Sequence, residues 1–121
     1  MSYHQPNYEA PLAYEIELGL QRIALAPDDV TLHKQLRTTA LRYKAAGGRA
    51  AGVLERMKLP SSNALQRLLH AERIWSFDPA NSDLVTKVLA ALAGLERAEQ
   101  ARDFIAVRRW LYTILSMSGS D

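Results

Sequence analysis

The chain has 121 residues, of which 48% are hydrophobic and 23% charged; these are the proportions of an ordinary globular domain rather than of a disordered chain. It contains no cysteine, which excludes a disulfide framework, thiolate zinc sites and cysteine catalysis. A net charge of +2 does not by itself indicate a nucleic-acid partner. No apolar run approaches the ~20 residues of a membrane span, and the N-terminus lacks a signal-peptide pattern. We therefore expect one cytoplasmic domain over residues 10–117, with flexible segments at 1–9 and 118–121.

The first half of the chain predicts three helices. The first opens at Pro11 and ends before Pro27, which cannot continue it. The second follows the capping carboxylates of Asp28 and Asp29 and ends at Gly47. A short third helix is expected over 49–58. The apolar residues that share a face in these helices, and that we expect to be buried, are Leu12, Ile16, Leu20 and Ile23, then Leu32, Leu36, Ala40 and Tyr43, then Val53, Leu54 and Met57.

The second half predicts three more helices. Asn63 and Gln66 have the spacing of a capping box that opens the fourth helix, which Pro79 closes. The fifth starts near Ser82 and the sixth near Arg102 or Asp103. Their expected core residues are Leu65, Leu68, Leu69 and Trp75, then Leu84, Val85, Val88, Leu92 and Leu95, then Phe104, Val107, Leu111 and Ile114. No alternation of period two indicates a strand, so the predicted fold is all-α, an antiparallel helix-hairpin array of five or six helices.

Two helix endings have the same pattern, Leu25-Ala26-Pro27-Asp28-Asp29 and Phe77-Asp78-Pro79-Ala80-Asn81. Together with Leu36, Val88, Gly47 and Asp103-Phe104, they resemble the tetratricopeptide repeat in a degenerate form, because the two endings are spaced more widely than that family's repeat of about 34 residues. The resemblance implies stacked helix hairpins whose surface binds other proteins. It also places Lys34 and Thr38 near positions that line the groove of members binding carboxylate-ended peptides.

A basic stripe follows the second predicted helix. His33, Arg37 and Lys44 lie along it, with Lys34 and Arg42 beside it. The stripe is either a solvated face or a groove for an acidic peptide or a phosphate backbone. No aromatic residue interleaves with it, which disfavours stacking on single-stranded nucleic acid. Later helices add further cations, namely Lys87, Arg97, Arg102, Arg108 and Arg109.

The last two predicted helices carry apolar residues that a single buried face does not explain. Trp110 and Met117 lie beside the core stripe of the sixth helix, so they either form a contact surface or are covered by the first helix or the N-terminal segment. The fifth helix gathers small residues, Ala90, Ala91, Ala93 and Gly94. These indicate either tight internal packing or a surface for a partner helix.

The sequence shows no constellation suited to catalysis. His4, His33 and His70 are far apart, and we expect them at the surface with no metal and no cofactor. The glycine-rich run 47–52 lacks the ending of a phosphate-binding loop, and no nucleophile–base pair is evident. We therefore expect a non-enzymatic protein–protein interaction adaptor or assembly subunit that binds another protein or a second copy of itself. The alternative is a small basic subunit of a nucleoprotein complex that contacts phosphates; a purely structural oligomer subunit is a third possibility. The expected partner-binding residues are Lys34, Arg37, Thr38, Arg42, Trp110 and Met117.

Overall fold

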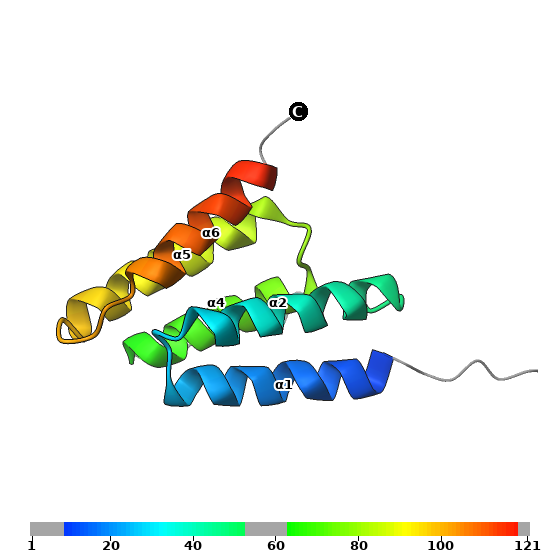
Figure 1. Cartoon of the computed structure of the whole chain (residues 1–121). Helices are drawn as coiled ribbons and strands as arrows, with labels where there is room; N and C mark the ends of the chain where they lie inside the picture. The colour runs from blue at the N-terminus through cyan, green and yellow to red at the C-terminus, as the bar shows by residue number, and fades with distance from the viewer. Residues whose placement is uncertain (1–8, 53–62, 119–121) are drawn as a thin grey trace, which may run out of the picture.

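The computed structural model describes residues 9–52 and 63–118, which form five helices and no strand (Figure 1). The helices are α1 (Glu9–Leu25), α2 (Val30–Ala45), α4 (Ala64–Phe77), α5 (Ser82–Ala98) and α6 (Ile105–Ser118). The all-α prediction with antiparallel neighbours is confirmed. The predicted helix over 49–58 is wrong for residues 49–52, which are not helical; its remaining residues lie outside the described part of the chain. None of the described helices is long and apolar enough to cross a membrane.

Side-chain caps set the helix starts at the expected places. The side chains of Asp29, Asn63 and Asn81 each accept a hydrogen bond from a backbone N–H of the first turn that has no partner within the helix. At the end of α2, Gly47 adopts a φ of 89°, in the left-handed region where a side chain is unfavourable. α1 begins two residues before Pro11, which is tolerated there because N–H groups of the first turn have no helical acceptor.

The five helices form two hairpins joined through α4. α1 packs along α2, and α4 lies against both of them. α5 contacts α4 and forms the second hairpin with α6, at an angle to the first (Figure 1). α6 also contacts α2. α1 therefore occupies an outer edge, where its principal contacts are with α2 and α4 alone.

The buried apolar side chains separate into two clusters. One joins α4, α5 and α6 and contains Leu68, Trp75, Leu84, Val85, Val88, Leu92, Leu95, Phe104, Val107 and Leu111. The other joins α1, α2 and α4 and contains Leu12, Ile16, Leu20, Ile23, Leu36, Tyr43 and Leu69. The expected burial of Trp75 is confirmed. Leu32, Leu65 and Ile114, predicted to be in the core, are only partly buried.

The small residues of α5 are not explained by tight packing at Gly94. A Cβ atom at this position would meet only a side-chain nitrogen of Arg97, at 3.9 Å. A close helix contact does occur at Gly19 of α1, where a Cβ atom would lie 3.1 Å from Cδ1 of Leu36. The glycine that allows close approach is therefore in the first hairpin.

Candidate functional site: the α2–α6 surface and the groove beside α1

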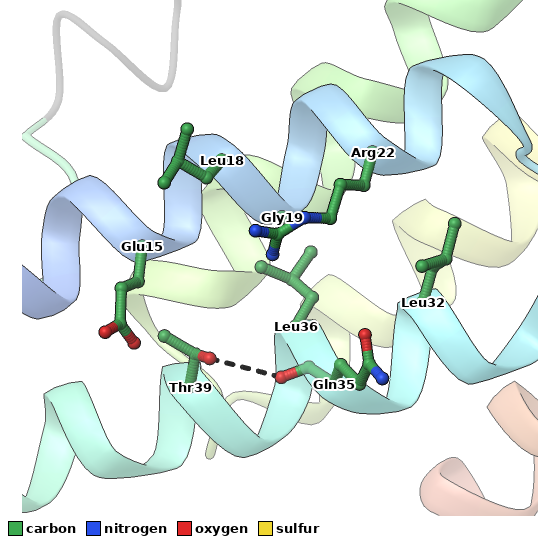
Figure 2. A pocket seen from close by; sticks show the side chains of 8 residues that line it. All are labelled: Glu15, Leu18, Gly19, Arg22, Leu32, Gln35, Leu36 and Thr39. Atoms are coloured by element: carbon green, nitrogen blue, oxygen red, sulfur yellow. Dashed lines mark hydrogen bonds between the residues drawn. The ribbon is translucent and has the colours of Figure 1, made fainter.

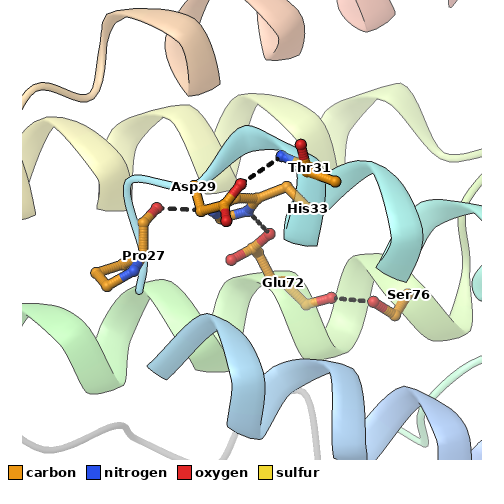
Figure 3. Close-up of polar contacts among 6 residues, drawn as sticks. All are labelled: Pro27, Asp29, Thr31, His33, Glu72 and Ser76. Atoms are coloured by element: carbon orange, nitrogen blue, oxygen red, sulfur yellow. Dashed lines mark hydrogen bonds and ion pairs between the residues drawn. The ribbon is translucent and has the colours of Figure 1, made fainter. Parts of the chain in front are cut away.

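His33 is buried, with 2% of its surface exposed, so the prediction of a surface histidine is wrong at this position. Its Nδ1 atom lies 2.6 Å from Oε1 of Glu72, and its Nε2 atom lies 2.7 Å from the backbone oxygen of Pro27 (Figure 3). A carbonyl oxygen can only accept, so Nε2 carries a hydrogen and donates it to Pro27. His70 is half-buried, and His4 lies outside the described residues.

The carboxylate of Glu72, which faces Nδ1 of His33, affects the protonation of the imidazole. Desolvation alone lowers the pKa of His33, but the negative charge of Glu72 and the hydrogen bonds to Glu72 and Pro27 outweigh it, so this pKa is raised overall. The ring therefore keeps its second proton at higher pH than an exposed histidine does. The result is a buried pair of opposite charges that ties the turn before α2 to α4. Within the described residues no group of three metal-ligating side chains occurs.

Trp75, from α4, contacts side chains from two other helices, α2 and α6. The ring centroid of Trp110, from α6, lies 5.9 Å from that of Trp75, and the guanidinium of Arg37, from α2, lies 5.1 Å from the Trp75 centroid. Arg37 also donates a hydrogen bond of 3.3 Å to the backbone oxygen of Pro79. Arg37 was predicted to lie on an exposed basic face, whereas it is half-buried and desolvation lowers its pKa. It connects α2 to the turn between α4 and α5.

The remaining predicted residues surround this stack to different degrees. Lys34 and Thr38 are exposed on α2, and the Thr38 hydroxyl donates to the backbone oxygen of Lys34. Trp110 is half-buried against His33 and Trp75, and Met117 is 68% exposed.

Arg42 points elsewhere, toward Glu15 of α1 at 4.0 Å. The structure thus brings Arg37 and Trp110 together and leaves Arg42 apart from them.

Exposed Leu41, which the sequence analysis did not select, lies between two of the cations of α2. Arg37, Leu41 and Lys44 follow one another at i, i+4 and i+7, so they share one side of α2. Met117 follows Trp110 by two helical turns on α6. We use the name α2–α6 surface for the residues Lys34, Arg37, Thr38, Leu41, Lys44, Trp110 and Met117, of which Arg37 and Trp110 both contact the Trp75 ring and Met117 lies further along α6.

In the part of the chain that the structure describes, the cations of the α2–α6 surface are not neutralised by carboxylates. Elsewhere on the molecule arginines pair with acidic side chains, as in Arg73 with Glu17 and Arg108 with Glu96. Within the described residues, no ion pair involves Lys34, Arg37 or Lys44. This surface therefore carries positive charge that the described part of the fold leaves uncompensated.

A groove of about 310 Å³ runs between α1 and α2 (Figure 2). Its apolar lining residues are Leu18, Leu32 and Leu36, and Leu36 makes the close contact with Gly19. Glu15 and Arg22, two helical turns apart on α1, line it with opposite charges. No residue pattern predicts this groove, because it depends on the spacing of two helices.

Comparisons with known proteins give no match: no family model fits the chain, and no curated protein or solved structure is significantly similar to it. The helix hairpins agree with the coarse architecture expected from the tetratricopeptide resemblance. A repeat of that family is not identified. Any functional inference therefore depends on the surfaces described above.

Proposed function

We propose that the protein is a non-catalytic adaptor or assembly subunit that binds an acidic, partly apolar segment of another protein on its α2–α6 surface. The observation that carries the proposal is the combination of Lys34, Arg37 and Lys44, which no described carboxylate neutralises, with the exposed side chains of Leu41 and Met117. Opposite charge accelerates encounter and selects the partner, whereas apolar burial holds the complex together.

The centre of this surface is held rigidly before a partner arrives. Arg37 is fixed by its hydrogen bond to Pro79 and by the Trp75 ring, and Trp110 is fixed against the same ring. Tryptophan and arginine are the residues that most often dominate binding energy at interfaces. Little side-chain entropy would be lost on binding at this point, while Met117 at the margin can adapt its shape to the partner.

A phosphate backbone is the competing ligand for these cations. It would use Lys34 and Lys44 but would gain little from the apolar side chains of Leu41 and Met117. Its affinity would also fall steeply with salt, because each phosphate contact releases a counterion. Truncation of the Met117 side chain and variation of the salt concentration therefore distinguish an acidic peptide ligand from a phosphate backbone.

A selection of short random peptides displayed against the immobilised chain tests the proposal. We expect enriched peptides to combine Asp or Glu with large apolar residues. We expect their affinity to fall at least about tenfold, or ~1.4 kcal/mol, both in the double variant Lys34→Glu/Lys44→Glu and in Met117→Ser. The double variant Lys87→Glu/Arg97→Glu makes the same charge change on exposed positions of α5 and should bind normally.

Two results would contradict the proposal. Equal loss of binding in the α2 and α5 double variants would indicate attraction to net charge alone. Tighter binding of a single-stranded oligonucleotide than of any enriched peptide, unaffected by Met117→Ser, would favour the nucleoprotein alternative.

A further inference from the structure

α1 carries an exposed apolar stripe on the side opposite its core face. Tyr14 is 65% exposed and Leu25 is 83% exposed, while Leu18 between them is half-buried. Tyr14, Leu18, Gln21 and Leu25 are separated by four, three and four positions, which is the spacing of a coiled-coil seam. Because α1 lies at the edge of the molecule (Figure 1), a second helix can approach this stripe without disturbing the core.

Charges of opposite sign flank the stripe on the side of the groove. Glu15 and Arg22 both line the groove between α1 and α2 (Figure 2). Within the described residues Arg22 forms no ion pair. Glu15 approaches Arg42 only at 4.0 Å, with both side chains at least half exposed, and such a pair contributes little to stability. Both charges are thus available to a partner.

This face is complementary to itself when two copies of α1 run antiparallel. In a two-fold symmetric pair, the same patch meets its own copy. When two α1 helices run antiparallel, Tyr14 comes opposite Leu25 of the partner subunit, and Glu15 comes beside Arg22 of the partner subunit. Symmetry makes each of these contacts twice.

We infer that the occupant of this face is a second copy of the chain, bound through antiparallel α1 helices that also cover the groove between α1 and α2. The interface is confined to one helix face and the adjacent groove, so it falls at the small end of specific interfaces and the dimer dissociates on dilution. It uses none of the residues of the α2–α6 surface, so this inference and the proposed function can fail independently.

Charge reversal across the interface tests the dimer directly. In sedimentation equilibrium of the whole chain over a range of concentrations, the unsubstituted protein should self-associate. Glu15→Arg alone places only cations at the four flanking positions, and Arg22→Glu alone places only anions there, so each should weaken self-association at least tenfold. An equimolar mixture of the two variants should recover it as a heterodimer, because every facing pair is again of opposite sign.

Replacement of Leu25 tests whether the apolar stripe of α1 forms the dimer interface. Leu25→Lys should give a monomer at concentrations where the unsubstituted chain is dimeric. Tyr112→Lys, at a position of α6 that is 56% exposed, is the matched control and should remain dimeric. Circular dichroism and melting of each variant establish that it is folded. A monomeric unsubstituted chain at every soluble concentration, a dimeric Leu25→Lys, or a mixture of charge variants that stays monomeric would each overturn the inference.

Discussion

Nδ1 of His33 and Oε1 of Glu72 lie 2.6 Å apart, although the two residues are 39 positions apart in the chain and both side chains are buried. This contact fastens the start of α2 to the middle of α4. Because α6 lies over it, with the Trp110 ring 6.4 Å from that of His33, the pair also lies beneath the α2–α6 surface. Its chemistry therefore affects how the two hairpins are held together.

Removal of one partner should be strongly destabilising. Glu72→Ala leaves the buried imidazole without its counter-charge, and we expect the free energy of unfolding to fall by about 3–5 kcal/mol, as for other buried ion pairs broken on one side. Glu17→Ala removes the carboxylate of an exposed pair with Arg73 and should change stability by less than ~1 kcal/mol. Urea denaturation compares the two; equal losses would show that burial gives the His33–Glu72 pair no special role.

Stability should decline on the alkaline side of neutrality. The pKa of His33 is raised in the folded chain, so its contribution is fully present below the unfolded value of about 6.5 and is lost as pH rises through the folded value. Denaturation midpoints measured from slightly acidic to mildly alkaline pH should therefore fall. Glu72→Gln removes the charge that raises this pKa, and its profile over the same range should be flatter. Parallel profiles for the two chains would refute the coupling.

Trp75 should be the most sensitive aromatic position. It is buried in contact with Trp110 and beneath Arg37, so Trp75→Ala should lower stability by about 3–5 kcal/mol. Thermal melting followed by circular dichroism measures the loss. Tyr112→Ala, on the exposed side of α6, should change stability by less than ~0.5 kcal/mol. A Trp75→Ala variant that melts with the parent would contradict the packing of α4 against α6.

Two glycines should respond in opposite directions to alanine. At Gly94, inside α5, the new methyl group meets nothing closer than 3.9 Å, so the variant should gain up to about 1 kcal/mol from helix propensity. At Gly48 the methyl group would overlap the Tyr43 ring, whose hydroxyl exchanges hydrogen bonds with the backbone of Arg49. Gly48→Ala should lose about 1–3 kcal/mol by overpacking. Denaturant midpoints of the two variants test the contrast.

The helices and most of their buried faces follow from local pattern, because caps, prolines and 3.6-residue periodicity act within a few residues. Leu84, Val88 and Leu92 of α5 are examples, all predicted and all buried. The interpretation of His33 was wrong for a physical reason: a histidine among lysines and arginines looks solvated until a distant carboxylate, Glu72, is brought to it. The half-burial of Arg37 likewise depends on Pro79, 42 positions away.

The exposed surfaces are likewise predicted in part from the sequence and depend in part on how the helices pack. Lys34 is exposed, as expected for the basic stripe, and Met117, for which the sequence left both exposure and cover by α1 or the N-terminal segment open, is exposed as well. The groove beside α1 depends on how closely two helices approach at Gly19, which no periodicity encodes. In the sequence alone, the stripe of Tyr14, Leu18 and Leu25 cannot be distinguished from the exposed side of any helix. Apolar residues opposite the core face indicate an interface only when the structure shows that this opposite side of α1 is uncovered.

The division of the core into two clusters has a consequence for amide hydrogen exchange. α4 contributes Leu68 and Trp75 to one cluster and Leu69 to the other, so neither hairpin can detach without uncovering one side of this helix. α1 and α6 each bury residues in a single cluster, and each can open while the opposite cluster persists. Amides of α4 should therefore exchange only through global unfolding, whereas those of α1 and α6 exchange through smaller and more frequent openings.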